Sequence, residues 1–553
     1  MKPQPTHHWD RETALVAQFA ACVSFISFAY YFQHGGLLLY GDAVAHINIA
    51  RRVFDSRTPG LLQLGTVWLP LPHLLLIPLL LSDSAWQSGI GGSVPSMVAY
   101  ALGAAGVFRL VRSALSGNSQ PDPAARTAAW LGAIVYAANP SLIYLQTTAM
   151  TESLYLALFI WVVVYFSEFV RASSRNDGPP REAYSSLMKC GLCLAAACLT
   201  RYDGWFLAVA MCVGALAVVV KSNNHNLRGS FAKFVLLAAA SPALWLAYNA
   251  AIYRNPLEFA NGPYSARAIE QKNATPGFPA HPGSHDLSVA FSYFLKSAEL
   301  NMAEGNWHRL WVLLLLAGTT VVLMFNRRLW PLLLLWTPLP FYMLSIAYAG
   351  VPIFLPVWWP FSFYNVRYGL QLLPLFSVTS ALTVYFLLGF ARNKTAKTAV
   401  VSTALILLVA SYASVWHAQP VCFREAWVNS RTRIALETEL ATNLKKLPHN
   451  STLLMYLGDH VGALQQAGIP LRRTINEGNH RPWKSPADSE GLWERALANP
   501  QQYVDFVVAL DGDPVARDAQ KQALASLVVI RTIGQPAATI YWTHGRSSDG
   551  HPR

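Results

Sequence analysis

The sequence predicts a polytopic α-helical membrane protein that ends in a small α/β domain. Of its 553 residues, 53% are hydrophobic and only 13% are charged, which is about half the charged fraction of a typical soluble domain. Apolar runs of roughly 15–25 residues recur along the chain, and each can cross a bilayer. After residue 416 the composition changes, and charged residues of both signs become frequent. A simple cytosolic enzyme and a disordered chain are both excluded.

We expect about eleven transmembrane helices. Their predicted ranges are 13–33, 92–112, 127–143, 153–170, 187–200, 203–220, 231–252, 308–325, 330–348, 368–391 and 398–416. A further apolar stretch, Leu69 to Leu81, has 13 residues and includes three prolines. It is too short for a regular span, so we interpret it as a re-entrant or interfacial segment.

Basic residues in the loops predict the orientation of these spans. If the N-terminus is cytoplasmic, every inner loop is basic, whereas the outer loops before residue 417 hold fewer basic residues over longer stretches. This is the positive-inside pattern. The net charge of +13 therefore has a topological cause, and no nucleic-acid partner is expected. We expect a multi-pass protein of the cell's inner (plasma) membrane with a cytoplasmic N-terminus.

Two domains follow from these patterns. Residues 1–416 form the transmembrane domain, with a first outer loop at 34–91, and residues 417–553 form a soluble extracytoplasmic α/β domain. In the second domain strands alternate with helices, which favours a small α/β layer. The expected helices are 431–446, 459–467, 486–498 and 514–527, and the expected strands are 452–457, 503–510, 528–533 and 538–542.

The first outer loop contains the first candidate site. Asp42 and His46 are four residues apart on a helix that we expect to begin near Asp42, so their side chains share a face. Two interpretations stay open from spacing alone. Asp42 could cap an amphipathic helix on the membrane surface, or it could be a carboxylate that waits for an acceptor just outside the bilayer.

Motifs at the outer ends of the predicted spans resemble those of the GT-C superfamily of membrane glycosyltransferases. The closest likeness is to the branch of protein O-mannosyltransferases and lipid A aminoarabinose transferases. The motifs are Asp42 with Ala50-Arg51-Arg52-Val53, Ala138-Asn139-Pro140-Ser141 leading to Thr151-Glu152, Leu199-Thr200-Arg201-Tyr202-Asp203-Gly204, and Arg367-Tyr368 with Leu372-Leu373-Pro374. Their order and placement over residues 13–416 support the resemblance.

The resemblance implies transfer of a sugar from a polyprenyl-phosphate carrier to a lipid, glycan or protein acceptor on the outer face. In that family the acidic residue of the first loop is the catalytic base, so Asp42 would deprotonate an acceptor hydroxyl for inverting displacement. A carboxylate suits this role because it accepts a proton as the nucleophile attacks. No cofactor is implied beyond the lipid-phosphosugar substrate, and no metal ligand set is evident.

Two arginines are candidates for the donor phosphate, because a guanidinium can bridge two phosphate oxygens. They are Arg201 and Arg367, and each could instead simply reach the membrane interface. We expect Glu152 to position the acceptor or to pair with one of these arginines, and Asp203 to hold Arg201 in place. Tyr368 directly follows Arg367 in the same motif, so we include it among the expected substrate-binding residues.

One departure from the family pattern affects the substrate. Much of the mannosyltransferase branch carries two consecutive acidic residues in the first loop, but here Ala43 follows Asp42. The resemblance therefore does not imply a mannosyl substrate for this chain. We expect His46, one helical turn later, to fill part of the missing polar role.

Three other motifs have competing interpretations. Asp511-Gly512-Asp513 follows an apolar strand, as in the metal-binding motif of nucleotide-sugar transferases, but a strand-to-helix turn capped by Asp513 explains it better. Cys190 and Cys193 form a CxxC inside an apolar helix, which favours packing over redox or metal chemistry. The polar segment 261–285 is long enough to be a lid, and disorder is equally compatible with it.

The main alternative function is that of a transporter or flippase for an envelope lipid or glycan. Transporters often contain inverted repeats and charges within their spans. This chain has no internal repeat, and its outer charges cluster at the ends of the spans. A non-catalytic membrane scaffold would leave these charges without a shared cavity. We therefore favour the glycosyltransferase.

Overall fold

The computed structural model describes residues 10–115, 122–174, 180–222, 226–273, 280–325, 327–480, 488–521 and 524–543. The predicted lid residues 274–279 and the start of the predicted helix 486–498 lie outside this part. The chain divides into two compact units. The helical unit comprises Met1–His34, Val94–Leu246 and Phe259–Glu425, and the loop–sheet unit comprises Gly35–Ser93, Ala247–Glu258 and Ala426–Arg553.

Nine helices in the described ranges are long and apolar enough to cross a membrane, and they coincide with nine of the predicted spans. They are α1 (Arg11–Gln33), α5 (Ile90–Leu115), α8 (Glu152–Ser173), α10 (Asp203–Lys221), α11 (Asn226–Tyr253), α15 (Trp307–Phe325), η3 with α16 (Arg327–Trp336, Pro338–Tyr348), η4 with α17 (Val366–Leu372, Leu373–Phe390), and α18 with α19 (Lys394–Ala418, Val421–Leu444). The protein is therefore a multi-pass membrane protein, as predicted.

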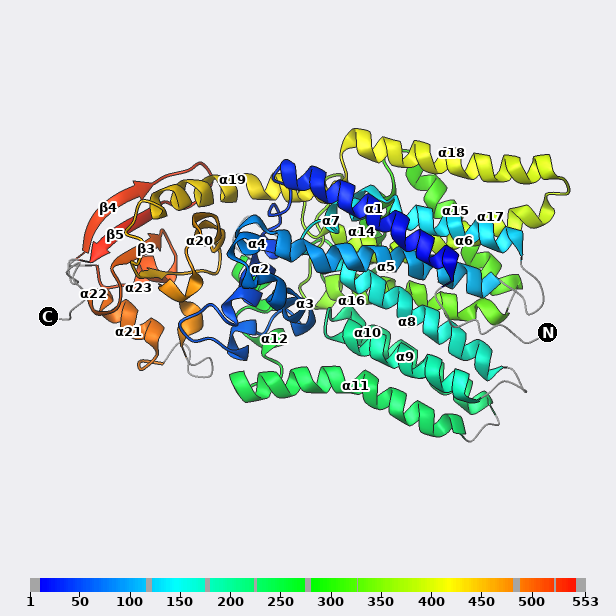
Figure 1. Cartoon of the computed structure of the whole chain (residues 1–553), viewed down its shortest axis with the longest axis horizontal. Helices are drawn as coiled ribbons and strands as arrows, with labels where there is room; N and C mark the ends of the chain where they lie inside the picture. Colours follow the sequence, from blue (N-terminus) through cyan, green and yellow to red (C-terminus); the bar gives the residue numbers. More distant parts are fainter. Residues whose placement is uncertain are drawn as a thin grey trace. The chain divides into compact units, whose positions relative to one another are not determined.

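Two further predicted spans are helical but shorter or more polar. One is α9 (Pro180–Cys198), which runs beside α8 and α10 (Figure 1). The other is divided between α6 (Pro123–Ala137) and α7 (Pro140–Leu145). The break falls before Pro140, since the residue preceding a proline is disfavoured in the helical conformation. Asn139 then caps α7 by accepting a hydrogen bond from the Leu142 amide.

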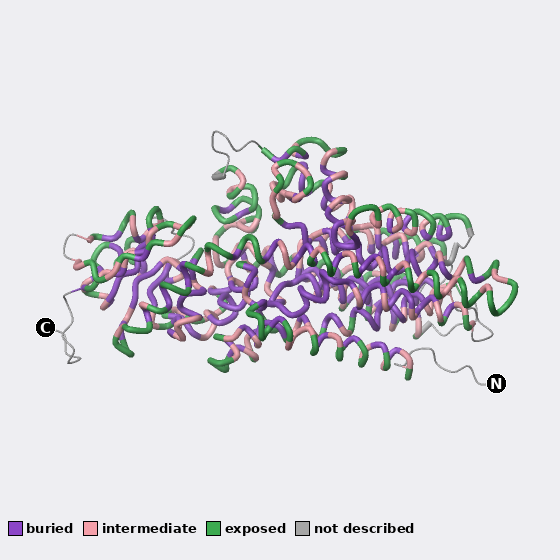
Figure 2. Tube along the Cα trace, turned by 90° about the horizontal axis from the view of Figure 1, so that it is seen from above, coloured by how far each residue is buried: buried purple, intermediate pink, exposed green. Residues whose placement is uncertain are grey.

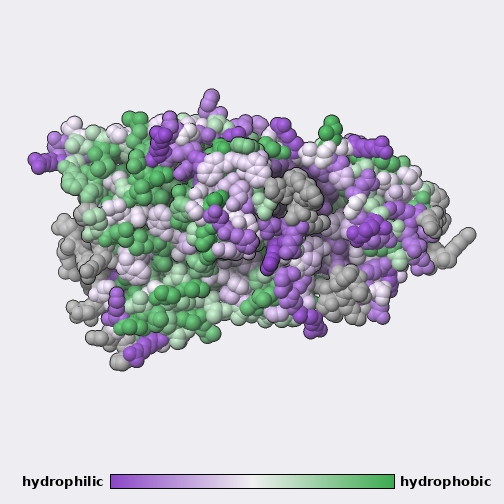
Figure 3. Space-filling view, turned by 180° about the vertical axis from the view of Figure 1, so that it is seen from behind, coloured by the Kyte–Doolittle hydropathy of each residue, from purple (hydrophilic) through white to green (hydrophobic). Residues whose placement is uncertain are grey.

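The outer surface of the helices is apolar, whereas their inner surfaces are buried. Large hydrophobic side chains such as Phe25, Val209, Leu236 and Leu323 are each about two-thirds exposed or more. Hydrophobic residues gather over the helices in Figure 3, and buried residues gather inside the bundle in Figure 2. Exposed apolar side chains on spanning helices are suited to contact lipid, so the bundle has the surface of an integral membrane protein.

Three helices lie between the predicted spans 231–252 and 308–325. They are α12 (Glu258–Asn261), α13 (Ala266–Asn273) and α14 (Leu287–Met302). The prediction missed α14 because its 16 residues include Lys296 and Glu299, so no long apolar run marks it. It nevertheless packs against α16 and η4 inside the helical unit.

The loop–sheet unit begins with the elements of the first outer loop. These are α2 (Gly41–Arg52), η1 (Leu61–Leu64), α3 (Pro70–Leu76), η2 (Ile77–Leu81) and α4 (Asp83–Ser88). The apolar segment from Leu69 to Leu81 thus forms two short helices that adjoin between Leu76 and Ile77, with Pro78 in the first turn of the second. Its placement in or on a membrane stays a prediction.

The C-terminal part of this unit contains a five-stranded sheet, with the strand order β2-β1-β3-β5-β4. Strands β1 (Leu453–Met455), β2 (Thr474–Ile475) and β3 (Phe506–Leu510) are parallel, whereas β4 (Leu524–Ile530) and β5 (Ala538–Thr543) pair antiparallel. The helices are α20 (Gly462–Ala467), η5 (Leu471–Arg473), η6 (Glu477–Asn479), α21 (Leu492–Ala498), α22 (Pro500–Tyr503) and α23 (Pro514–Asp518). The predicted α/β layer is confirmed.

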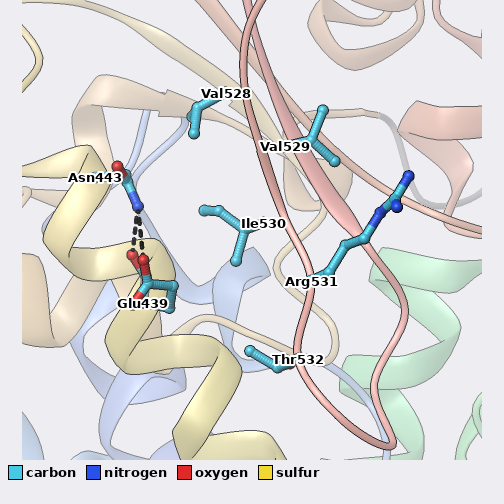
Figure 4. Close-up of a pocket in the computed structure, with 7 residues that line it drawn as sticks. All are labelled: Glu439, Asn443, Val528, Val529, Ile530, Arg531 and Thr532. Atoms are coloured by element: carbon cyan, nitrogen blue, oxygen red, sulfur yellow. Dashed lines mark hydrogen bonds between the residues drawn. The ribbon is translucent and has the colours of Figure 1, made fainter.

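The predicted helix 514–527 is wrong beyond its first turn. The helix α23 ends at Asp518, and the strand β4 begins at Leu524. Pairing with β5 overrides the local preference of an Ala- and Gln-rich stretch, as tertiary contacts often do. Figure 4 shows the hollow beside this edge strand. It is lined by Glu439 and Asn443 of α19 and by residues 528–532, which form the end of β4 and the two positions after it.

Candidate active site

Five charged side chains from four segments converge inside the helical unit. Glu152 begins α8, Asp203 begins α10, Arg201 immediately precedes α10, Arg367 lies on η4 and Glu425 lies on α19. The three carboxylates are at most 2% exposed, whereas Arg367 is 7% and Arg201 is 15% exposed. Burying a charge is expensive unless it is paired, so the geometry of the pairs decides what the cluster can do.

Glu152 joins the two arginines that the motifs predicted as phosphate ligands. Its Oε1 atom lies 3.2 Å from Nε of Arg367 and 3.4 Å from Nη1 of Arg201. Glu152 was expected to pair with one arginine or to position the acceptor. In the structure it contacts both arginines.

Glu425 fixes Arg367 through both its side chain and its backbone. Oε1 of Glu425 accepts from Nη1 of Arg367 at 2.8 Å and from the amide of Asn365 at 3.1 Å, and Oε2 accepts from the Arg367 amide at 3.3 Å. The carboxylate therefore satisfies two backbone donors at the start of η4. Gly369 allows this element to pack on α14, because a Cβ atom there would overlap the backbone of Ser297.

Arg201 is held by the turn between α9 and α10. Its guanidinium donates to Thr151 Oγ1 at 3.1 Å and to Tyr342 OH at 2.8 Å, and its Nε lies 3.4 Å from Asp203. The Tyr342 hydroxyl donates to Asp203 Oδ2 at 3.1 Å. The turn is tight, since a Cβ on Gly204 would lie 2.7 Å from the Ala197 carbonyl. The predicted pairing of Asp203 with Arg201 is therefore present in the structure.

Tyr368 lies between the two arginines. Its ring centroid is 4.9 Å from Cζ of Arg201 and 5.1 Å from Cζ of Arg367. A second aromatic ring, that of Tyr342, lies 5.3 Å from the Tyr368 ring. Arginine over an aromatic face is a favourable cation–π contact. Tyr368 thus orders both guanidinium groups, which gives its place in the motif a physical reason.

The cluster is not fully satisfied by the protein. Two arginines face three carboxylates, so the five groups together carry one excess negative charge when all are ionised. Within the part of the chain that the structure describes, Oε2 of Glu152 and Oδ1 of Asp203 are buried and lack a hydrogen-bond donor. Arg201 uses four of its five N–H groups. Buried acceptors and a remaining donor are features of a site that is completed by a ligand.

Asp42 and His46 belong to the loop–sheet unit. The helix α2 begins at Gly41, and Tyr40 occupies its N-cap position without a side-chain cap bond. Asp42 is therefore a first-turn residue and not the N-cap. It is partly exposed, whereas His46 is buried. The face shared by these two residues is consistent with the helix that the sequence predicted.

His46 is paired with a second histidine that the prediction did not select. Its Nδ1 lies 2.8 Å from Nε2 of His73, and its ring packs against Trp68 with 4.8 Å between centroids. One ring nitrogen must donate and the other must accept at this distance. Burial lowers the pKa of His73 well below its usual range, and the nearby His46 and Arg52 act in the same direction. His73 is therefore neutral.

The competing motifs have structural explanations. Asp513 caps α23, since its carboxylate accepts from the amides of Ala516 and Leu510, so the Asp511-Gly512-Asp513 motif forms the strand-to-helix turn. Cys190 is a buried free thiol and Cys193 is a partly buried one. Among the described residues, no group of three or more His, Cys, Asp or Glu side chains is arranged to hold a metal ion.

Sequence reasoning missed Glu425 and Tyr342 in the cluster. Glu425 follows the last predicted span, where it was assigned to the soluble region, and Tyr342 lies inside a span as one of many aromatic residues. The adjacent pair Arg424-Glu425 just beyond an apolar run was the available signal for Glu425. Nothing in the local sequence distinguishes Tyr342.

The chain is a multi-pass membrane protein, and solved structures share its fold. No protein-family model and no curated protein match the sequence. Among solved structures, the chain is similar to ArnT from Cupriavidus metallidurans bound to undecaprenyl phosphate. That similarity has a TM-score of 0.58 and 13% sequence identity, and it covers 98% of this chain and 99% of ArnT.

Two other structures share the fold. The apo form of the same ArnT has a TM-score of 0.56 at 13% identity and covers 95% of this chain and 97% of that chain. The archaeal oligosaccharyltransferase AglB from Archaeoglobus fulgidus, in complex with an inhibitory peptide and a dolichol-phosphate, has a TM-score of 0.50 at 13% identity, covering 90% of this chain and 69% of AglB. At the level of fold, the resemblance that the motifs predicted is confirmed.

Proposed function

We propose that this protein is an integral-membrane glycosyltransferase that uses a polyprenyl-phosphate-linked sugar as donor. The observation that carries the proposal is the cluster of Arg201, Glu152 and Arg367 inside a GT-C fold. ArnT, the similar protein that covers nearly the whole chain, was crystallised with undecaprenyl phosphate. A guanidinium at the end of spanning helices, such as that of Arg201, offers the chemistry that a phosphate headgroup needs.

The two arginines have different proposed roles. Arg201 is the more exposed of the two and keeps a donor, so we assign it to the donor phosphate. Arg367 is fixed by Glu152 and Glu425, and it positions Glu152. The free oxygens of Glu152 and Asp203 would accept hydrogen bonds from hydroxyl or amino groups of the sugar or the acceptor.

Asp42 is the proposed general base. It would take the proton of an acceptor hydroxyl as that oxygen attacks the anomeric carbon from the side opposite the phosphate. The bond between the anomeric carbon and the phosphate oxygen breaks, and the polyprenyl phosphate leaves with the added negative charge. Arg201 would stabilise this charge as it develops. The configuration of the sugar inverts.

The reaction would take place on the outer face of the inner (plasma) membrane, where a lipid, glycan or protein is the acceptor. This location rests on the basic inner loops, which favour a cytoplasmic N-terminus and an extracytoplasmic C-terminal domain. Reporter fusions after residues 176, 273 and 450 test it. The first should report the cytoplasm and the other two the outside. An inside signal from the fusion after residue 450 would overturn the orientation.

The activity is tested by transfer from a radiolabelled polyprenyl-phosphate sugar pool in membranes with matched protein levels. Asp42→Asn keeps the size of the side chain but removes the proton acceptor, so transfer should fall by about 10²–10⁴-fold, while the protein still inserts and binds donor. Near wild-type transfer by this variant would remove Asp42 as the base. If the wild-type protein transfers nothing from any such pool, a transporter or flippase becomes the better interpretation.

A further inference from the structure

The helix that carries the proposed base does not fix its own amino end. Tyr40 is the N-cap residue of α2, and its side chain makes no cap bond. Asp42 lies in the first turn, so its position depends on how the preceding backbone is held. Leu39 and Tyr40 are buried at 6% and 5% exposure. Contacts from elsewhere in the loop–sheet unit must therefore define this segment.

Arg433 of α19 holds the backbone that leads into α2. Its Nη2 atom donates to the carbonyl oxygens of Leu38 and Leu39, both at 2.9 Å, and its Nη1 donates to Glu437 at 2.7 Å. The guanidinium lies alongside the first residue of the helix, since a Cβ on Gly41 would be 3.9 Å from Nε of Arg433. Glu437 is 2% exposed and anchors the arginine in this geometry.

Two further contacts hold α2 from the same C-terminal region (Figure 1). Halfway along the helix, Gln465 of α20 accepts from the Asn48 side chain at 2.7 Å and donates to the Trp86 carbonyl at 2.7 Å. Beyond its end, the carboxylate of Asp55 accepts from the amides of Leu471 and Arg472, both at 3.2 Å. The helix is thus held before its start, at its middle and after its end.

We infer that the C-terminal region, residues 426–543, is a support that positions Asp42, and that Arg433 is a positioning residue for it. This inference rests on the proposed function, in which Asp42 is the base. Arg433 fixes the two carbonyls that lie three and four residues before Asp42. A displacement of about 1 Å at a reacting group can cost about 10²-fold in rate, so a guanidinium that fixes the backbone can matter as much as a catalytic group.

Arg433→Lys is the first test, because lysine keeps the charge but cannot reproduce the planar fork that serves two carbonyls and a carboxylate. We expect kcat for sugar transfer to fall by about 10- to 100-fold and KM for the lipid donor to stay unchanged. Hydrogen exchange of the amides in the first turn of α2 should become faster, while amides of the central strand β3 keep their protection.

Arg473→Lys is the matched control. Arg473 also donates to a backbone carbonyl in the same unit, that of Ser451, through Nε at 2.9 Å and Nη2 at 2.7 Å. This variant should keep wild-type kcat and wild-type exchange in α2. A second variant, Glu437→Gln, keeps the size of the anchoring side chain and should reproduce the Arg433→Lys effect more weakly. It keeps the inference testable if Arg433→Lys fails to fold.

The outcomes separate this inference from the proposed function. Wild-type kcat per folded molecule and unchanged exchange in both Arg433→Lys and Glu437→Gln would overturn the inference. So would an equal loss in Arg473→Lys, because the effect would then be a general loss of stability. If Asp42→Asn keeps transfer in the same assay, the base assignment fails instead. If Asp42→Asn abolishes transfer while the Arg433 and Glu437 variants are normal, only the positioning role is wrong.

Discussion

Each unit of the molecule contains a cluster of arginines and carboxylates with a buried centre, and the two clusters differ in how fully they are hydrogen bonded. In the loop–sheet unit the centre is Arg51 with Asp55, whereas their partners Asp83 and Arg472 are 65% and 63% exposed. In the loop–sheet unit, Arg51 donates to Asp55 at 2.8 Å, to the Leu80 carbonyl at 2.6 Å and to Asp83 at 2.5 Å. Asp55 also accepts from Arg472. Two positive and two negative side chains balance there, and each part of the Arg51 fork has an acceptor.

The cluster around Arg201 and Arg367 lacks this balance. It has one more carboxylate than it has arginines, and one oxygen each of Glu152 and Asp203 is buried without a donor. An unsatisfied buried acceptor costs free energy. The Arg51 cluster is therefore balanced within the protein, whereas the Arg201 cluster keeps acceptor oxygens that, under the proposed function, the sugar or the acceptor would meet.

The largest expected effect is a loss of stability in the loop–sheet unit. Arg51→Met should lower the free energy of unfolding by about 1.5–3 kcal/mol, because the buried Asp55 carboxylate would lose its Arg51 donor and keep only Arg472 and two backbone amides. Thermal unfolding in detergent measures this. Arg517→Met is the control, since Arg517 pairs with Asp518 in an exposed position and should change little. A small effect in Arg51→Met would mean that the cluster does not support the fold.

Replacing Arg201 should instead affect the donor. Arg201→Lys keeps the charge but cannot contact Thr151, Glu152, Tyr342 and a phosphate together, so KM for the lipid-phosphosugar should rise by about 10- to 100-fold. The thermal midpoint should change little. Arg109→Lys is the control, because Arg109 forms a comparable pair with Glu168 at 2.7 Å in the same unit. An unchanged donor KM would remove Arg201 from the phosphate site.

The spans could be predicted because the bilayer leaves a clear pattern in the sequence, in which apolar runs of sufficient length alternate with polar loops. The role of each arginine could not be predicted from the sequence. Arg51 and Arg201 both occur in family-like motifs, but their partners are distant in sequence. Asp83 and Arg472 meet at the Arg51 cluster, and Glu152 and Tyr342 surround Arg201. Only the folded chain reveals which of the two clusters is satisfied.

The helix α14, which the prediction missed, and the first residues of β4, which it assigned to a helix, share the same cause. The helix α14 contains two charged residues, and the strand β4 lies in a stretch with helical preference, so tertiary packing decides both. His73 and Glu425 also lay outside the selected residues. His73 is part of a proline-rich apolar segment, and its importance depends on His46, which is 27 residues away.

Stability should also depend on pH through His73. Its pKa is lowered by burial, whereas in the unfolded chain it titrates near pH 6.5. Below about pH 6.5 the unfolded state binds a proton that the folded state does not. Stability is therefore fully present above that pH and falls as pH drops toward the folded-state pKa, by up to about 1.4 kcal/mol per pH unit.

His73→Gln removes this titration, so its thermal midpoint should depend less on pH between about pH 5 and 7 than that of the wild type. His449→Gln is the control, because His449 is an exposed histidine of the same unit and should leave the wild-type slope intact. Equal slopes in His73→Gln and the wild type would show that His73 does not titrate differently in the two states.

The smallest effect is expected at Tyr368. Its ring centroid lies about 5 Å from the guanidinium carbons of both Arg201 and Arg367. Tyr368→Leu removes both cation–π contacts while keeping an apolar side chain of moderate size. At about 0.5–1 kcal/mol for each contact, transfer should fall by roughly 5- to 30-fold, with the loss mainly in KM for the donor. Tyr368→Phe keeps the ring and should stay close to the wild type. If Phe and Leu are equally impaired, the hydroxyl group and not the ring matters. If neither is impaired, the aromatic contact contributes only to packing, and the two arginines are ordered by their hydrogen-bond partners without it.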